Sequence, residues 1–350
     1  MDKASVFRWA LVGVMLLALA ATLSSPALAE VEPLPLDQLV PGRPTRAAGW
    51  TYTPASEAGA GQKIVRFDAE SGVWAATETD APESLYDWIE YEDASIRVDV
   101  SFLTARPAKK KEELPCAVVR IRLADPSQLR TAMSYDNYDK MEFVKADAMA
   151  KHVNAVVAVD GDFFKYHFDV GYVVRQGEFY RDALNGKRDL LLIDQNGDFH
   201  AADRATSADA QALIARMESE GLTVINSFSL GPVLVEDGAA RDMAQTGAAE
   251  YDQLQWDTPQ QRVAVCQLGE LEYAVVEAFG KTDGSCGMTL QEFAAFIAYE
   301  FPDCRMAYNL DGGGSTNVIV NGKRIHRTPG ARDISDILYF ASASTEGTSR

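Results

Sequence analysis

Short blocks of apolar residues, separated by turn signals, run through the middle of the chain. Residues 96–102 alternate between polar and apolar side chains, as in a half-buried strand, whereas 155–159 is an unbroken apolar run typical of a buried strand. Hairpins are predicted at 171–180 and at 190–199, the second because Asn196 and Gly197 form a favoured two-residue turn. These blocks predict a sheet-rich core.

Helical spacing of apolar residues appears in only a few segments. It predicts helices at 145–152, 208–221 and 287–299, the last with Thr289 as its N-cap. Further strands are predicted at 116–123, 224–238, 263–266, 273–278 and 318–320. Alternating hairpins with a few helices favour the α+β class, as a single mixed-sheet domain packed by helices.

The N-terminus has the pattern of an export signal. Lys3 and Arg8 accompany an apolar run over 9–23, which is shorter than the roughly 20 residues of a membrane-spanning helix. Small residues at Ala27 and Ala29 then suit a signal peptidase. We expect a signal peptide over 1–29, a secreted or extracytoplasmic protein and no membrane span after cleavage; the alternative is a retained anchor.

Composition divides the rest of the chain. Pro, Ala and Gly are frequent between residues 30 and 60, which predicts a tether or an extended wrap over the domain. We therefore expect an N-terminal extension or linker over 30–90, the catalytic domain over 91–342 and a flexible tail over 343–350. The formal charge of −18 argues against nucleic acid as a partner, although a small anionic substrate can still bind a locally basic pocket.

The four cysteines leave several arrangements open. Export permits disulfides, and four cysteines allow three full pairings that sequence alone does not separate. Cys286 and Cys304 flank the helix predicted at 287–299, so a bridge between them would tie it down. Buried free thiols are the alternative.

The segment 309–316, here called the Gly loop, concentrates groups that carry chemistry. Three glycines permit positive φ angles and close approach of a ligand, and successive backbone N–H groups in such a turn can bind an anion. Around them lie an amide, a carboxylate and two hydroxyls; the loop comprises Asn309, Leu310, Asp311, Gly312, Gly313, Gly314, Ser315 and Thr316. A functional site is favoured over a plain surface turn.

Three further places can contribute to a site. Asp160 and Asp162 follow the buried strand at 155–159, where carboxylates are costly unless they are paired or functional. Arg262 begins a predicted strand, and His326 lies a few residues before Arg332. The alternatives are a turn cap for the aspartates, a surface ion pair for Arg262 and a rim position without a role for His326.

These segments resemble, in order, the conserved blocks of the phosphodiester glycosidase domain family. The resemblance covers residues 150–341; its blocks are 155–164, 229–238, 261–265, 309–315 and 332–340. It implies the family's fold and an activity on phosphodiester-linked glycans. The alternative function is a non-catalytic glycan-binding or envelope polysaccharide assembly protein on the same scaffold.

The resemblance also implies roles for the candidate residues. Cleavage of a sugar-1-phosphodiester at the anomeric carbon needs a carboxylate as base or nucleophile, and Asp311, Asp162 and Asp160 are the candidates. Cations and N–H groups would hold the departing phosphate, and side chains would bond the sugar: Arg262, Arg332, Gly312, Gly313, Gly314, Ser315, Asn309 and Thr316. The family often has Asn at the position of Asp160. This extra carboxylate either keeps a proton or shares a cation such as calcium with Asp162.

Overall fold

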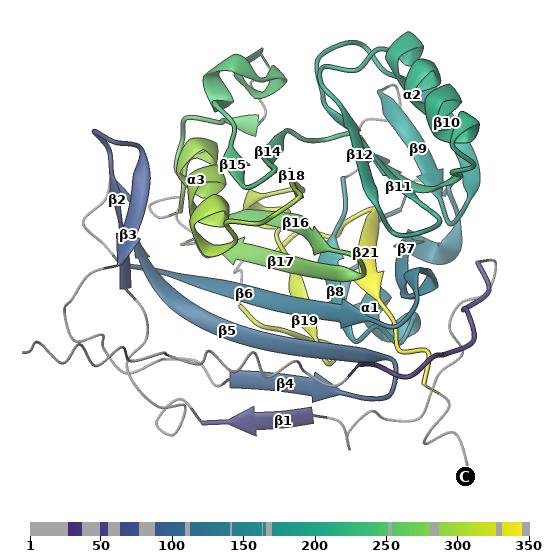
Figure 1. Cartoon of the computed structure of the whole chain (residues 1–350), viewed down its shortest axis with the longest axis horizontal. Coiled ribbons are helices and arrows are strands. Elements are labelled where there is room, and N and C mark those ends of the chain that lie inside the picture. Colours follow the sequence, from purple (N-terminus) through teal and green to yellow (C-terminus); the bar gives the residue numbers. More distant parts are fainter. Residues whose placement is uncertain are drawn as a thin grey trace, which may run out of the picture.

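A computed structural model gives the fold of the chain (Figure 1). It describes residues 27–36, 50–54, 64–76, 88–108, 113–140, 142–162, 164–165, 170–250, 254–280, 287–326 and 331–344. The α+β class is confirmed: three α-helices and four sheets occur in these residues, and the sheets are antiparallel except where β2 pairs in parallel with β5.

The largest sheet has eleven strands and spans the molecule, with the long β5 and β6 beneath β17 in Figure 1. Its order is β1-β4-β5-β6-β17-β16-β18-β14-β15, with β2 joined to β5 and β3 to β2. The strands are β1 (Trp50–Thr53), β2 (Ile64–Asp68), β3 (Val73–Ala76), β4 (Trp88–Glu92), β5 (Ile96–Arg106), β6 (Leu114–Leu123), β14 (Val233–Glu236), β15 (Ala239–Ala240), β16 (Arg262–Gly269), β17 (Glu272–Ala278) and β18 (Met306–Asn309).

A five-stranded sheet packs against the large one. Its order is β20-β19-β8-β21-β7, and its strands are β7 (Leu129–Met133), β8 (Val157–Asp160), β19 (Val318–Val320), β20 (Lys323–Arg324) and β21 (Asp336–Phe340). Valines of β8 and Phe340 of β21 belong to the same buried cluster as the core of the large sheet. The helix α1 (Ala146–His152) packs on β8 and β21 through a second cluster.

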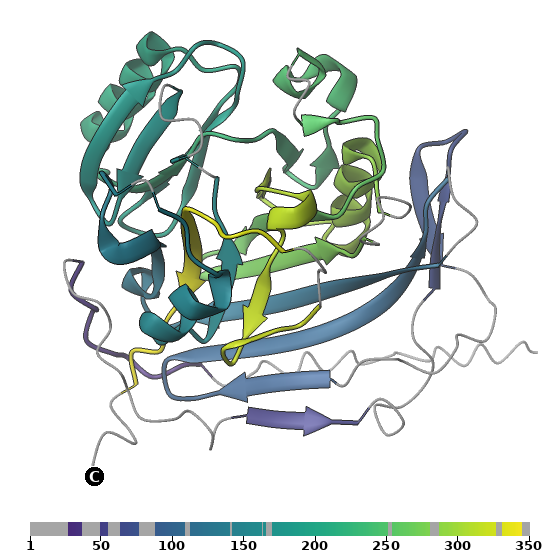
Figure 2. The same cartoon turned by 180° about the vertical axis from the view of Figure 1, so that it is seen from behind.

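The segment between β8 and β14 forms a small lobe, seen at the upper left in Figure 2. It holds two small sheets and one helix: β9 (Gly171–Arg175), β10 (Glu178–Ala183), β11 (Leu190–Asp194), β12 (Phe199–Ala202), β13 (Val224–Phe228) and α2 (Ser207–Ser219). Apolar residues of α2, β9 and β11 form its own buried cluster. The expected single sheet is thus divided, because this lobe buries its apolar side chains locally.

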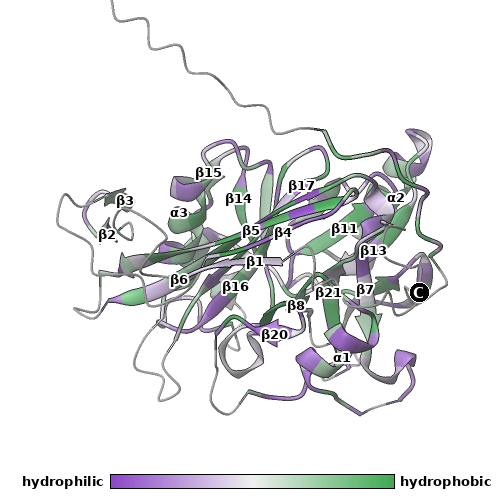
Figure 3. Ribbon diagram, turned by 90° about the horizontal axis from the view of Figure 1, so that it is seen from below, coloured by the Kyte–Doolittle hydropathy of each residue, from purple (hydrophilic) through white to green (hydrophobic). Residues whose placement is uncertain are grey.

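The helix α3 (Leu290–Glu300) confirms the predicted cap. The Thr289 hydroxyl accepts from the Glu292 N–H, and the Glu292 carboxylate accepts from the Thr289 N–H at 2.9 Å, which is a capping box. Phe293, Phe296 and Ile297 are fully buried against the large sheet. Figure 3 shows this concentration of apolar residues along the strands and on α3.

The N-terminal extension belongs to the domain where it is described. Strands β1 to β4 extend the large sheet, so the described residues between 50 and 92 are part of the fold. Leu34 is buried, and its N–H donates to the Ser127 hydroxyl at 2.7 Å, as expected of a wrap. Residues 1–26 of the predicted signal and 345–350 of the predicted tail lie outside the described residues. Within the described residues, none of the helices is long and apolar enough to cross a membrane.

Candidate functional site

Two of the predicted clusters meet where strands of both main sheets end. β8 ends at Asp160 and β18 at Asn309, so the residues that follow each strand lie side by side. The Asp311 N–H donates to the Gly161 carbonyl at 3.1 Å, and the Gly161 N–H donates to the Asp336 carbonyl at 3.0 Å. The fold thereby brings carboxylates from three distant segments into one cluster.

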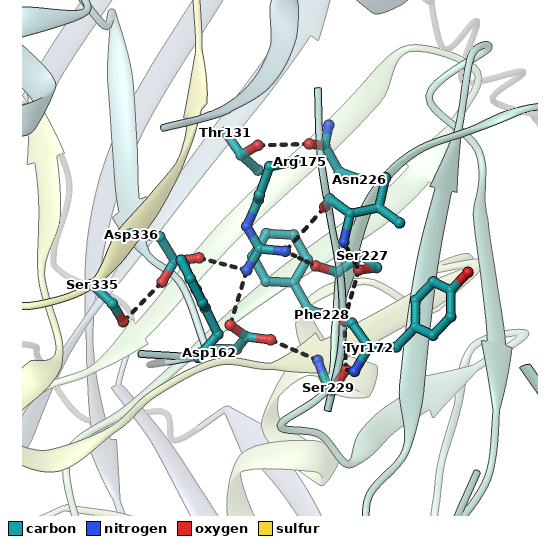
Figure 4. A network of polar contacts seen from close by, with 12 residues as sticks. Thr131, Asp162, Tyr172, Arg175, Asn226, Ser227, Phe228, Ser229, Ser335 and Asp336 are labelled. Atoms are coloured by element: carbon teal, nitrogen blue, oxygen red, sulfur yellow. Dashed lines mark hydrogen bonds and ion pairs between the residues drawn. The ribbon is translucent and has the colours of Figure 1, made fainter. Parts of the chain in front are cut away.

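Arg175 of β9 is the cation at the centre of this cluster (Figure 4). Its Nη2 donates to Asp162 Oδ1 at 2.9 Å and to Asp336 Oδ2 at 2.7 Å, and all three side chains are buried. The second oxygen of Asp162 accepts from the Ser229 N–H at 2.7 Å. Asp162 is therefore held at both carboxylate oxygens, by Arg175 and by the Ser229 N–H. Burial raises the pKa of Asp336 to about 6, and the charge of Arg175 opposes this rise.

Asp160 lies deeper. It is fully buried, and its Oδ1 accepts from the Asn317 N–H at 2.6 Å. Burial raises its pKa well above the usual value, and the negative charges of Asp311 and Glu277 raise it further. This environment favours the protonated, uncharged form of Asp160, which was one of the two expected ways to relieve carboxylate repulsion.

Asp311 is the accessible member of the cluster. It is partly exposed, whereas Asp160, Asp162 and Asp336 are 0%, 4% and 1% exposed. Desolvation raises the pKa of Asp311 to about 7, although the Ser315 hydrogen bond and the charge of Arg332 oppose the rise. A carboxylate that titrates near neutral pH and faces solvent is suited to act as an acid, a base or a nucleophile.

The Gly loop holds its shape through its own backbone. Gly313 has φ +60° and begins a short 3-10 turn over Gly313–Ser315. The Gly313 N–H donates to the Gln261 carbonyl at 2.9 Å, and the Ser315 N–H donates to Gly312. Two of the four N–H groups predicted to bind phosphate are thus used within the structure.

Arg332 lies against the same loop. Its backbone N–H donates to the Gly314 carbonyl at 2.9 Å, and a Cβ on Gly314 would come within 3.1 Å of the Arg332 Nε. The residue is exposed, and its charge acts on Asp311. Arg332 is therefore placed to meet an anion beside the Asp311 carboxylate.

Comparison with known proteins identifies the chain. The sequence matches the phosphodiester glycosidase family over residues 153–341. The chain belongs to this family. A protein of Bacillus subtilis (strain 168), the SPbeta prophage-derived uncharacterized protein YomE, is 26% identical over 203 residues, which are 57% of this chain and 28% of that protein. The chain therefore spans well under half the length of this curated relative.

A solved structure has the same fold. The catalytic domain of zebrafish N-acetylglucosamine-1-phosphodiester alpha-N-acetylglucosaminidase, auto-inhibited by its pro-peptide, superimposes with a TM-score of 0.57 at 15% identity, covering 91% of this chain and 96% of that one. At this identity the likeness shows the fold alone. It does not identify the substrate of this chain.

Two residues that were predicted to bond sugar hydroxyls lie inside the protein. Asn309 and Thr316 are only 2% and 1% exposed. The Asn309 Nδ2 donates to the Gly231 carbonyl at 2.9 Å, which ties the end of β18 to the loop before β14. Both residues line the inner side of the Gly loop, so their predicted contacts with sugar hydroxyls stay predictions.

Arg262 has a different environment from the one expected of a phosphate ligand. Its guanidinium is buried and donates to four backbone carbonyls at 2.8–3.1 Å, those of Met288, Leu254, Gln255 and Thr258. Burial lowers its pKa to about 9. This geometry gives Arg262 a role in holding the 254–258 segment beside the Gly loop, and we do not include it among the phosphate contacts.

Several site residues were not predicted from the sequence. Arg175 and Asp336 stand inside predicted strands and look like ordinary polar positions. Glu277 is likewise one of two charged residues in the strand β17 and is not distinguished by its sequence position. It is buried, and its Oε1 accepts from the Gln261 Nε2 at 2.9 Å. Gln261 thus connects the Gly loop to a further carboxylate.

Calcium and a disulfide were each one of the alternatives left open by the sequence. Both oxygens of Asp162 are used by Arg175 and Ser229, and the described part of the chain holds no group of three or more His, Cys, Asp or Glu side chains arranged for a metal ion. Cys304 is a buried free thiol, which favours the alternative of buried thiols; Cys286 lies outside the described residues.

Proposed function

We propose that this family member is an exported hydrolase that cleaves sugar-1-phosphodiester linkages of glycans, with Asp311 as its reacting carboxylate. The observation that carries the proposal is the position of Asp311. It is the partly exposed member of a cluster of otherwise buried carboxylates, its pKa is raised to about 7, and the exposed Arg332 lies beside it. Membership of the phosphodiester glycosidase family supports the choice of the glycosidic phosphodiester as the bond that is cleaved.

The chemistry fits the groups present. In hydrolysis the bond between the anomeric carbon and the phosphate oxygen breaks, and that oxygen keeps the electron pair. Because a phosphomonoester is a good leaving group, the protein has to supply a base or nucleophile and positive charge rather than a strong acid. Asp311 provides the first and Arg332 the second. As a base, Asp311 takes the proton of the attacking water; as a nucleophile, it forms a glycosyl ester that water then cleaves.

The buried groups position the reacting one. Asp162 and Asp336 share Arg175, which fixes the turn after β8, and that turn holds the Asp311 backbone through Gly161. The uncharged form of Asp160 limits repulsion beneath Asp311. We assign Asp160 and Asp162 to positioning, since neither is exposed enough to meet a sugar directly.

Export is part of the proposal. The predicted signal peptide at 1–29 supports a secreted or extracytoplasmic location, where phosphodiester-linked glycans of cell surfaces are available. N-terminal sequencing of secreted protein should begin at Glu30. A membrane-bound product that retains residues 9–23 would contradict this part of the proposal.

The activity test is direct. Purified protein should release free sugar and a phosphomonoester from a synthetic sugar-1-phosphodiester, and the Asp311→Asn variant should not. The anomeric configuration of the first product distinguishes the two roles of Asp311, because a nucleophile gives retention and a base gives inversion. Saturable binding of the glycan without turnover would instead support the non-catalytic glycan-binding or envelope-assembly function.

A further inference from the structure

A histidine that the proposed mechanism does not use, His326, contacts Glu277 and Gln261. The His326 Nδ1 is 3.5 Å from Glu277 Oε1 and 3.2 Å from the Gln261 Nε2. Its ring stacks on Phe279 with centroids 4.0 Å apart and the planes at 15°. These contacts fix the ring from one edge and one face, while 14% of the side chain remains exposed.

The same contacts connect this histidine to the candidate active site. The Gln261 side chain donates to Glu277, and the Gln261 backbone carbonyl accepts from the Gly313 N–H at 2.9 Å. The negative charge of Glu277 also contributes to the raised pKa of Asp160. Gln261 therefore contacts His326 through its side chain and the Gly loop through its backbone carbonyl.

The hydrogen bonds determine where the ring can donate. In the neutral ring, Nδ1 can accept from Gln261 and the proton then sits on Nε2; in the charged ring, Nδ1 donates towards Glu277 and Nε2 still carries a proton. Within the described residues, no hydrogen bond uses the His326 Nε2. In both of these states Nε2 carries a proton that no described residue uses, and the side chain is partly exposed.

We propose that His326, oriented by Glu277 and Gln261, is a phosphate-binding residue of this site, donating from Nε2–H to the phosphate group of the substrate. The proposal rests on the proposed function for the class of ligand. In its charged form the ring also supplies a positive charge, which an oxyanion favours. The charged group in contact with the ring is Glu277 on β17, which also acts on Asp160, and Asp160 in turn is affected by Asp311.

The first experiment needs no turnover. Ring ¹⁵N signals of the wild-type histidines should be followed during titration with inorganic phosphate, and then with glucose 1-phosphate. The His326 signals should shift saturably, whereas those of His152, an exposed histidine paired with Asp136 at 2.7 Å, should not. Unmoved His326 signals at phosphate concentrations that saturate the protein would overturn the proposal. A response to glucuronate but not to phosphate would overturn the assignment of phosphate.

The second experiment uses variants. His326→Gln should weaken phosphate binding by about tenfold, the usual effect of losing one charge-assisted hydrogen bond. The control His152→Gln should bind as the wild type does. If the protein hydrolyses sugar-1-phosphodiesters, kcat/KM should also fall by about tenfold in His326→Gln and stay at the wild-type value in His152→Gln.

The outcomes separate the two proposals. Phosphate binding that depends on His326, without any hydrolysis, would support this inference and reject the proposed activity. Hydrolysis by the wild type, together with wild-type phosphate binding in His326→Gln, would support the proposed activity and reject this inference.

Discussion

The Asp336 carboxylate lies directly against Gly161. A Cβ placed on Gly161 would come within 2.3 Å of Asp336 Oδ2, the oxygen that accepts from Arg175. The turn between Asp160 and Asp162 therefore needs a residue without a side chain, for a reason of space, because a carboxylate occupies the position. This contact couples the turn after β8 to the start of β21.

Substitution of Gly161 by Ala should therefore disturb the buried ion pairs. The methyl group has to displace Asp336, and we expect a loss of about 1–3 kcal/mol in the free energy of unfolding, together with reduced activity. Urea denaturation measures the first and kcat/KM the second. Gly269→Ala is the matched control, because the nearest atom to its new Cβ is 3.4 Å away. Equal stability of the two variants would contradict the contact.

Removal of the Arg175 charge should lower the free energy of unfolding strongly. Arg175→Met leaves the buried Asp162 and Asp336 without their cation, and such a loss typically costs about 3–5 kcal/mol. The cost should shrink as pH falls through about 6, where protonation of Asp336 removes part of the unpaired charge. Denaturation at two pH values tests both statements. Arg97→Met, which breaks an exposed pair with Glu92, should cost little at either pH.

Asp160→Asn should stabilise the protein at neutral and alkaline pH. The folded-state pKa of Asp160 lies well above its unfolded value, so folding must either take up a proton or bury a charge, and this cost grows as pH rises. Asn keeps the oxygen that accepts from Asn317 and never ionises. The melting temperature should exceed that of the wild type at pH 8, by about 2–4 °C for each kcal/mol gained, and the difference should vanish near pH 4. A variant that melts lower at pH 8 would show that Asp160 is charged and paired.

Thiol titration tests the cysteines. Cys116, Cys266 and Cys304 are buried and form no disulfide with one another, and Cys286 lies outside the described residues. Protein unfolded without reductant should therefore show the same number of reactive thiols as protein unfolded after reduction. A lower count before reduction would indicate a disulfide.

The sequence predicted the elements well, because apolar periodicity and turn residues act locally. The predicted strand at 96–102 and helix at 208–221 correspond to β5 and α2, and the cap at Thr289 was assigned correctly. The division into four sheets was missed. Whether hairpins join one sheet or form a separate lobe depends on which apolar faces meet, and that is a matter of long-range packing.

Within the site, groups marked by glycines or by an adjoining apolar run were easier to predict than their charged partners. The Gly loop and Asp160 were recognised from glycine content and from a carboxylate after an apolar strand. The partners Arg175, Asp336 and Glu277 were not, since a charged residue within a strand looks the same whether it faces solvent or another buried charge. Arg262 shows the converse: its sequence position suggested a ligand, and the fold surrounds it with carbonyls.

The decisive prediction concerns Asp311. Asp311→Asn retains the size of the side chain but cannot act as a base or nucleophile, so kcat/KM on a sugar-1-phosphodiester should fall by about a hundredfold or more. In the wild type, the pKa of Asp311, raised to about 7, should give an acidic limb: activity requires the ionised form and is lost as pH falls through about 7. Asp160→Asn is the control, since it changes a buried neighbour and should remain active. Turnover at the wild-type rate in Asp311→Asn, with an unchanged acidic limb, would exclude Asp311 from the reaction; a large loss of melting temperature with a proportionate loss of activity would mark it as a structural cap of the Gly loop.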